Sequence, residues 1–373
     1  LRQLADAGRV VLVVTHSVSY LDVCDQILLV APGGKTAFNG PPSQVGAALG
    51  TTNWADIFAN VGADPDEANR RFIEREGRQQ QPQAPARGSP ADLGEPVHTD
   101  VLRQLSTIAR RQVRLVVSDR GYSVFLAVLP FLIGALSLTV KGPKPGLGPA
   151  LPNGLAPTEP QYIMVLLNIG AVFMGTALTI RDLIGERPIF RREQAVGLST
   201  TAYLLAKVSV FCVFATAQAA IATFIVRLGK GAPTAHPPFF GNSTFSLFVT
   251  VAGTCVASAM LGLLLSAVAQ SNEQIMPLLV VSIMSQLVLS GGMIPVTGRA
   301  GLNQLSWVTP GRWGYAAGAS SIDFPNLVKV PQIPTNDPIW QHSKHIYLFD
   351  MVMLAVLSVF YIGYVRWNIR LKR

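Results

Sequence analysis

A chain of 373 residues that is 49% hydrophobic and only 14% charged lies well below the charge content of soluble domains, which is about 25%. The net charge of +9 would suit a nucleic-acid-binding protein, but the basic residues cluster beside apolar stretches and no aromatic residues alternate with them. The composition therefore excludes a wholly soluble protein and argues against a nucleic-acid partner. It favours a mainly α fold, with a polytopic membrane domain after a small α/β region.

Residues 1–77 are expected to form the small soluble α/β part. A helix over residues 1–8 ends at Gly8, and the run Val-Val-Leu-Val-Val at 10–14 predicts a buried strand that leads directly to His16. Open α/β sheets place ligand-binding loops at the carboxyl ends of strands, so His16 is a candidate donor to a terminal phosphate. A purely structural histidine is the alternative.

A short helix is expected near residues 20–25, and residues 26–30 and 36–38 predict a hairpin across the sequence Pro-Gly-Gly-Lys at 32–35. About seventy residues of this kind cannot build a large core alone. Because the chain also begins at Leu1 rather than Met, we expect it to belong to a longer protein.

Residues 78–98 are rich in Gln and Pro and predict a disordered linker. Residues 99–120 predict an amphipathic connecting helix in the plane of the headgroups, with an ordinary helix packed on the soluble domain as the alternative. Its apolar stripe consists of Val101, Leu105, Ile108, Gln112 and Val116.

Residues 121–373 are expected to form a six-span membrane domain, since a span needs about 20 mostly apolar residues. The expected spans are 121–140, 162–180, 202–226, 245–269, 275–290 and 346–365. Basic residues gather before the first span, between the second and third, and after the sixth. By the positive-inside rule, we expect a multi-pass protein of the cell membrane with both termini cytoplasmic.

The loop between the second and third spans carries the sequence Gly-Glu-Arg-Pro-Ile-Phe-Arg-Arg-Glu at residues 185–193, followed by Tyr203, Leu204 and Lys207. Its arginines would each cost about 2.5–3.5 kcal/mol at the membrane midplane, so the segment must lie outside the bilayer core. Mixed charges at helical spacing predict a polar surface helix that docks against another domain. A solvated loop with topogenic arginines is the alternative.

Two features involve small residues in the spans. In the fourth span, Thr254, Ser258, Gly262 and Ser266 recur every fourth residue, which suits a dimer seam, a substrate path or plain packing within the chain. At the end of the fifth, Leu289, Ser290, Gly291 and Gly292 are followed by Pro295. We expect these last residues to break the span on the outer side so that the backbone can turn.

Cys24, Cys212 and Cys255 fit no metal-ligand spacing, so no metal site is expected. The sequence contains no Gly-x-x-x-x-Gly-Lys-Ser/Thr phosphate loop, and no acidic pair precedes the strand expected at 10–14. We therefore expect that this chain does not hydrolyse ATP by itself.

Residues 1–50 resemble the last third of the nucleotide-binding domain of an ABC transporter, and residues 53–58 (Asn-Trp-Ala-Asp-Ile-Phe) resemble an Asn-Pro-Ala-Asp-Phe element of the G subfamily, with Trp54 replacing proline. The 186–193 run resembles the coupling segment of G-subfamily membrane domains, and the membrane half as a whole is similar to the G subfamily or the bacterial ABC-2 type. The pattern is also similar to actinobacterial exporters with forkhead-associated domains. The outer-loop cysteines of the family are absent.

This resemblance implies that His16 is the switch histidine that senses the ATP γ-phosphate. It implies that the motion of the ATPase reaches the spans through a set of five coupling residues, namely Glu186, Arg187, Phe190, Arg191 and Glu193. ATP and Mg²⁺ would then serve the full-length protein, without being fully bound by this chain. A six-span half-transporter cannot enclose a two-fold pathway alone, so a homodimer surrounded by membrane lipids is expected. The apolar spans favour an amphipathic or lipid substrate, and the resemblance implies that it is exported.

A membrane-embedded transferase with a cytoplasmic N-terminal domain is the alternative from a different functional class. It would need Asp, Glu or His residues clustered at a membrane face. Glu186, Glu193 and Glu273 are scattered along the chain, while Asp323, Asp337 and Asp350 are expected on the outer side without an obvious partner.

Overall fold

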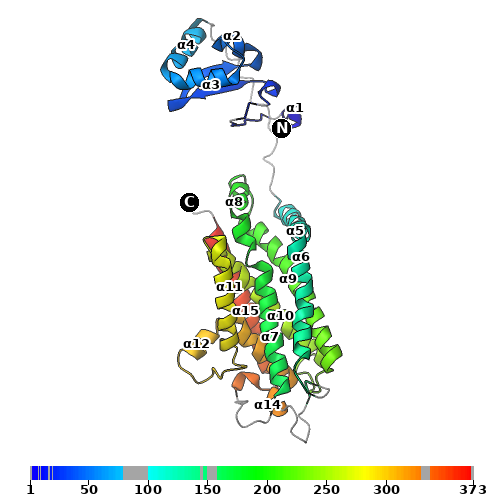
Figure 1. Ribbon diagram of the computed structural model, residues 1–373. Coiled ribbons are helices and arrows are strands. Elements are labelled where there is room, and N and C mark those ends of the chain that lie inside the picture. The colour runs from blue at the N-terminus through cyan, green and yellow to red at the C-terminus, as the bar shows by residue number, and fades with distance from the viewer. Residues whose placement is uncertain are drawn as a thin grey trace. The chain divides into compact units, whose positions relative to one another are not determined.

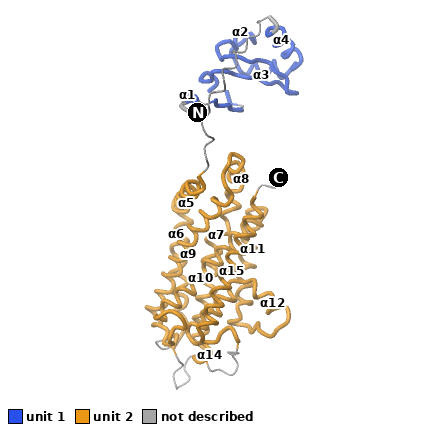
Figure 2. The backbone as a smooth tube through the Cα atoms, turned by 180° about the vertical axis from the view of Figure 1, so that it is seen from behind, with its two compact units in different colours: residues 1–96 blue, residues 97–373 orange. Residues whose placement is uncertain are grey.

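The computed structural model describes residues 2–6, 8, 10–15, 17–18, 20–78, 100–142, 146–148, 158–328 and 337–370. The chain divides into two compact units, Leu1–Pro96 and Val97–Arg373 (Figure 2). The expected linker lies almost wholly outside the described residues, and so does His16.

The first unit contains a two-stranded antiparallel sheet, β1 (Ile27–Ala31) and β2 (Lys35–Gly40), which is the hairpin expected from the sequence. Gly33 and Gly34 both have positive φ in the turn, which residues with a Cβ rarely adopt. The helical elements are α1 (Arg2–Asp6), α2 (Val45–Leu49), α3 (Trp54–Ala63), α4 (Pro65–Arg78) and the 3₁₀ turns Leu21–Val23, Pro32–Gly34 and Pro42–Gln44. A small core joins the sheet to α2 and α3 through Ile27, Ala31, Ala37, Phe38, Val45, Ile57 and Val61.

The prediction of a buried strand at residues 10–14 is wrong. Residues 10–15 form no strand, and the side chains of Val10, Leu12 and Val14 are almost fully exposed. An apolar run becomes a buried strand only when a neighbouring strand takes its hydrogen bonds and another layer covers it. In the described part of this unit the sheet consists of β1 and β2 alone, and neither pairs with this run.

Asn53 caps the N-terminus of α3, where its side chain accepts a hydrogen bond from the amide of Ala55. Trp54 therefore occupies the first helical position. Proline is favoured at that position because its missing N–H would have no intrahelical partner there. Any residue with helical backbone angles also fits, so this helix start tolerates tryptophan in place of proline.

The second unit begins with α5 (Val101–Ser118), capped by Asp100 and buried through Ile108, Gln112 and Val116. Within the described residues, six helical segments are long and apolar enough to cross a membrane, as the sequence predicts. They contain α6 (Arg120–Leu138), α7 (Glu159–Thr179), α9 (Thr200–Lys230), α10 (Ser243–Val268), α11 (Ile275–Leu289) and α15 (Lys344–Ile369) (Figure 1). The second segment continues past α7 to Ala195, and the fifth reaches span length only with the 3₁₀ turn that precedes α11. The remaining elements are α8 (Asp182–Ala195), α12 (Leu302–Ser306), α13 (Pro310–Ile322), α14 (Phe324–Leu327) and the 3₁₀ turns Asn272–Gln274 and Pro338–Trp340.

The centre of this unit is the contact between α7 and α10. Gly175 lies against the backbone of Cys255 and Ala259, so that any Cβ at Gly175 would collide with main-chain atoms. The hydroxyl of Thr179 donates to the carbonyl of Ala259 at 2.7 Å. The expected small-residue stripe of α10, which includes Gly262, is buried in this contact. Of the alternatives left open by the sequence, packing within the chain is therefore the one that the structure shows.

α13 is buried along its whole length, and α7, α10 and α15 all pack around it. Such a short helix can be buried at this depth because its polar groups find partners inside the protein. The amide of Asn168 on α7, for example, donates to the carbonyl of Gly311 at 2.9 Å.

Candidate functional site

α8 is a polar helix at one end of the bundle, in the sequence interval where a polar surface helix was expected (Figure 1). Its C-terminus is closed by a Schellman motif, in which the amide of Gly197 donates to the carbonyl of Gln194 and that of Leu198 to the carbonyl of Glu193. Gly197 supplies the positive φ that this motif requires. The helix therefore has a definite end, and the chain turns back at once into α9.

A buried cluster of ion pairs holds α8 against α5 and α9. We call it the α8 network, and it comprises Arg111, Gln112, Asp182, Glu186, Glu193, Tyr203 and Lys207. At its centre the Nζ atom of Lys207 is 2.6 Å from Asp182 Oδ2 and 2.9 Å from Glu186 Oε2.

Lys207 is fully buried, and it also donates to Gln112 Oε1 at 2.7 Å. The amide of Gln112 in turn donates to Asp182 Oδ1 at 2.7 Å, so the two side chains that flank the ammonium are themselves joined. A buried ammonium is tolerated only when it is paired and hydrogen-bonded. The network meets that requirement with partners from two other helices, which makes the positions of α5, α8 and α9 depend on one another.

Arg111 extends the network toward the C-terminal end of α8. Its guanidinium donates to Glu193 Oε1 and lies 3.6 Å from Glu186 Oε2. Partial burial acts to lower the pKa of Arg111, but the bond to Glu193 and the charges of both glutamates outweigh it and raise that pKa. The side chain therefore stays charged and bridges α5 to two carboxylates that lie about two turns apart on α8.

An aromatic pair lies beside these charges. The rings of Phe190 and Tyr203 are stacked with their centroids 4.2 Å apart, and the hydroxyl of Tyr203 donates to Glu186 Oε2 at 3.0 Å. Phe190 is buried. Tyr203 thus contributes both an apolar contact and a hydrogen bond to the same helix.

The other connection of α8 is to the end of α10. The Arg187 guanidinium donates to the carbonyls of Ala267 at 3.1 Å and Ala269 at 2.8 Å, which are the free carbonyls at that helix terminus. In return, the hydroxyl of Ser266 accepts from the amides of Leu183 and Ile184 at the start of α8, at 3.0 and 3.1 Å. Each helix end thereby satisfies the unpaired backbone groups of the other.

Four of the five expected coupling residues point into the membrane unit through these contacts, namely Glu186, Arg187, Phe190 and Glu193. The fifth, Arg191, is exposed and has no ion pair within the described residues. Ile189, Arg192 and Val196 are also exposed. α8 therefore has an inner side that is tied to three helices and an outer side that is open.

The residues expected to break the fifth span lie at the opposite end of the bundle. α11 ends at Leu289, and Gly291 follows with a φ of 85°. A Cβ at Gly291 would lie 2.2 Å from Arg312 Nη1, and one at Gly292 would meet the ring of Tyr315. Both glycines therefore allow α11 to end against the buried α13. Ser290 accepts weakly from Arg312 through its carbonyl, while Pro295 lies in the irregular segment before α12.

Arg312 is a buried cation at this second end. It donates to Asp337 Oδ2 at 2.7 Å and to the hydroxyl of Thr297. Asp350, expected from the sequence on the outer side, is fully buried within α15, and neither of its carboxyl oxygens has a hydrogen-bond partner among the described residues.

Sequence reasoning did not single out Arg111, Gln112, Asp182 or Ser266 as site residues. Gln112 did carry a signal, because it is the one polar side chain on the apolar stripe of α5. A polar residue at a buried helical position requires a partner. Ser266 was noticed only as a member of the small-residue stripe, and its role as an acceptor for α8 depends on the tertiary contact.

Six membrane-length helices, with charged side chains buried in paired networks at both ends of the bundle, define a polytopic α-helical membrane protein. Residues 103–322 match the ABC-2 type transporter family, so the chain belongs to that family. The chain is also 65% identical over 372 residues to the "ABC transporter ATP-binding/permease protein Rv1747" of Mycobacterium tuberculosis. That alignment covers 100% of this chain and 42% of the length of that relative.

Proposed function

We propose that this chain is the membrane-spanning half of an ATP-driven exporter of the G-subfamily type, that it works as a homodimer, and that α8 transmits the motion of the ATPase to the spans. The chain is the membrane domain of an ABC transporter by family. The direction of transport, the substrate and the dimer are parts of the proposal.

The observation that carries the proposal is the two-sided character of α8. Its inner side is joined to α5, α9 and α10 through Arg111, Lys207 and Ser266. Its outer side leaves Ile189 and Arg191 exposed. A helix that is rigidly tied to three others and open on one side can pass a push from a docked domain to all three at once.

ATP use is supported by the name of the Mycobacterium tuberculosis relative, which is called an ATP-binding/permease protein. In the full-length protein, His16 would donate to the γ-phosphate of ATP, and Mg²⁺ would accompany the nucleotide. This chain has no phosphate loop of its own, so those groups would be held mainly by other parts of the complete protein.

An amphipathic or lipid substrate is supported by the apolar surface of the spans. Charged side chains at the ends of the bundle form ion pairs. Lys230 Nζ lies 2.6 Å from Glu159 Oε1, and Arg312 pairs with Asp337. Asp350 is an exception among the described residues, but the pairs otherwise leave few free charges to bind a small hydrophilic ion. Both termini would be cytoplasmic, on the side of α8.

The test uses the full-length transporter, reconstituted in vesicles that contain a fluorescent phospholipid analogue. With ATP and Mg²⁺, the wild type should move the analogue between leaflets while it hydrolyses ATP. Arg191→Gln should lower the amount of lipid moved per ATP, because it weakens docking on the open side of α8. His16→Ala should lower hydrolysis itself.

The matched control is Arg227→Gln, which removes an exposed arginine near the other end of α9. It should leave both rates unchanged. Equal lipid movement per ATP in Arg191→Gln and the wild type would show that the outer side of α8 does not transmit the motion of the ATPase. Hydrolysis without lipid movement in the wild type would rule out the lipid substrate.

A further inference from the structure

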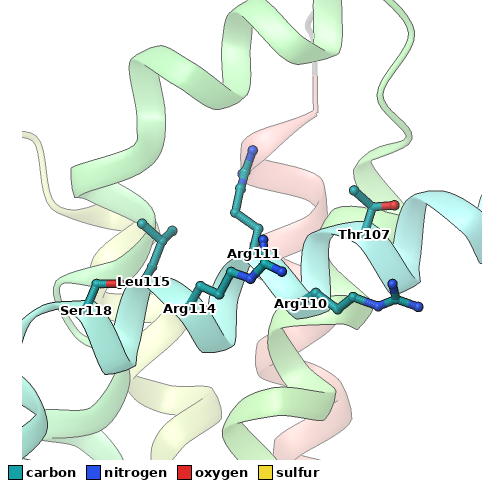
Figure 3. Close-up of a pocket in the computed structure, with 6 residues that line it drawn as sticks. All are labelled: Thr107, Arg110, Arg111, Arg114, Leu115 and Ser118. Atoms are coloured by element: carbon teal, nitrogen blue, oxygen red, sulfur yellow. The ribbon is translucent and has the colours of Figure 1, made fainter.

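α5 carries a basic groove that the α8 network does not account for. Its lining consists of Thr107, Arg110, Arg111, Arg114, Leu115 and Ser118, and its volume is about 380 Å³ (Figure 3). We call it the α5 groove. Its volume lies in the range of small-ligand sites, which runs from about 300 to 1,000 Å³.

The lining residues follow one side of the helix. Thr107, Arg111, Arg114 and Ser118 are spaced by four, three and four residues, which places them one above another on successive turns. Two hydroxyls therefore flank the guanidinium groups along the groove. The hydroxyl of Thr107 already donates to the carbonyl of Arg103 at 2.9 Å, so the arginines and Ser118 supply the donors of this row that can bind phosphate oxygens.

The arginines of the groove differ in what they contact. Arg111 is held by Glu193 and Glu186 of α8. Arg110 and Arg114 are exposed, and neither forms an ion pair within the described part of the chain. In Figure 3 the side chain of Arg111 extends away from those of Arg110 and Arg114. The groove therefore presents two uncompensated positive charges beside a third that is fixed in place.

The surroundings of the groove distinguish a lipid from a dissolved anion. Leu115 lines the groove and has an exposed apolar side chain. The groove reaches Ser118, two residues before α6, the first membrane-length helix, begins at Arg120. A free phosphate gains nothing from an exposed apolar side chain, whereas the glycerol and first acyl carbons of a phospholipid would pack against it.

From these observations we propose that the α5 groove binds the phosphate headgroup of an anionic phospholipid, with Arg110 and Arg114 as its principal ligands. Basic clusters directly beside a span attract anionic lipids. The site needs no nucleotide, so it does not depend on α8 transmitting motion or on the substrate that is transported. Its occupancy would fix α5 at the membrane surface while Arg111 remains bound to α8.

The proposal can be tested with the full chain in phosphatidylcholine nanodiscs that contain increasing amounts of a photoactivatable phosphatidylglycerol. Mass spectrometry would quantify the lipid adduct on peptides from α5. The wild type should saturate at a low phosphatidylglycerol fraction. Arg110→Gln/Arg114→Gln should need on the order of 25-fold more, since each arginine near an anionic surface contributes about five-fold in affinity.

The matched control is Arg103→Gln/Arg120→Gln, which removes two exposed arginines from the same region but outside the lining. It should stay close to the wild type, and both double variants should unfold at the wild-type temperature. If both double variants lost labelling to the same extent, the lipid would be attracted by the overall positive charge of this surface rather than by the groove. If a phosphatidylcholine probe labelled α5 equally well, the groove would not select the headgroup. Suppression of the labelling by inorganic phosphate added before irradiation would make this a site for free anions. Each of these results would overturn the proposal.

Discussion

Lys207→Met offers the most direct test of how α8 is held. The substitution keeps the length of the side chain but removes the charge that lies 2.6 Å from Asp182 and 2.9 Å from Glu186. Two carboxylates would then share a buried site without their cation. Removing one partner of a buried ion pair costs about 3–5 kcal/mol, a large part of the roughly 5–15 kcal/mol that stabilises a typical domain.

The measurement is the thermal unfolding of the purified protein in nanodiscs, followed by intrinsic fluorescence. A loss of this size corresponds to a decrease in Tm of about 6–20 °C for a domain of 150–250 residues. Adding Asp182→Asn and Glu186→Gln to Lys207→Met should restore much of the Tm, because the uncompensated carboxylates are then gone.

Arg192→Met is the control, since it removes an exposed charge from α8 and should change the free energy of unfolding by less than about 0.5 kcal/mol. If Lys207→Met unfolded at the same temperature as Arg192→Met, the ion pairs would contribute nothing to the position of α8. If the triple variant were no more stable than Lys207→Met, the loss would come from packing rather than from unpaired charge.

Three further substitutions test single contacts by the same unfolding measurement. Ser266→Ala should cost about 1–3 kcal/mol, because the two amides at the start of α8 lose their acceptor; a loss near zero would mean that solvent replaces it. Tyr203→Phe should cost about 1.5 kcal/mol through the bond to Glu186 while the stacked ring remains, and an unchanged Tm would show that this bond is not formed. Gly291→Ala should cost at least about 1–2 kcal/mol, since its φ of 85° and the nearby guanidinium both exclude a Cβ. Gly363→Ala, where a Cβ would meet nothing, should be neutral or slightly stabilising, and similar losses at both glycines would contradict the turn geometry.

The sequence was sufficient to predict the helices and strands that are determined by neighbouring residues or by the surrounding lipid or water. Membrane-length apolar runs predict the six spans because lipid leaves a helix as the simplest way to satisfy the backbone. The hairpin followed from two apolar runs around a Gly-Gly turn, and α5 from apolar residues at helical spacing. The polar helix α8 followed from charges too costly to place in the bilayer.

Local sequence patterns were misleading where a segment needs a partner from elsewhere in the fold. Residues 10–14 have the composition of a buried strand, but burial requires a neighbour that this unit does not provide among its described residues. The direction of each side chain of α8 was also beyond the sequence, which predicted a docking surface without separating its two sides. Glu186 and Arg191 look alike as charged residues of one helix, yet one is bound to Lys207 and the other is exposed.

What the sequence determined by itself is the class of molecule: an apolar, six-span chain with its basic residues gathered beside the spans. What only the tertiary structure decided is which charges meet. Arg111 lies 82 residues from Glu193, and Lys230 lies 71 residues from Glu159. Hydropathy acts along the chain and can be read from it, whereas a buried ion pair forms only when packing brings distant segments within about 3 Å of each other.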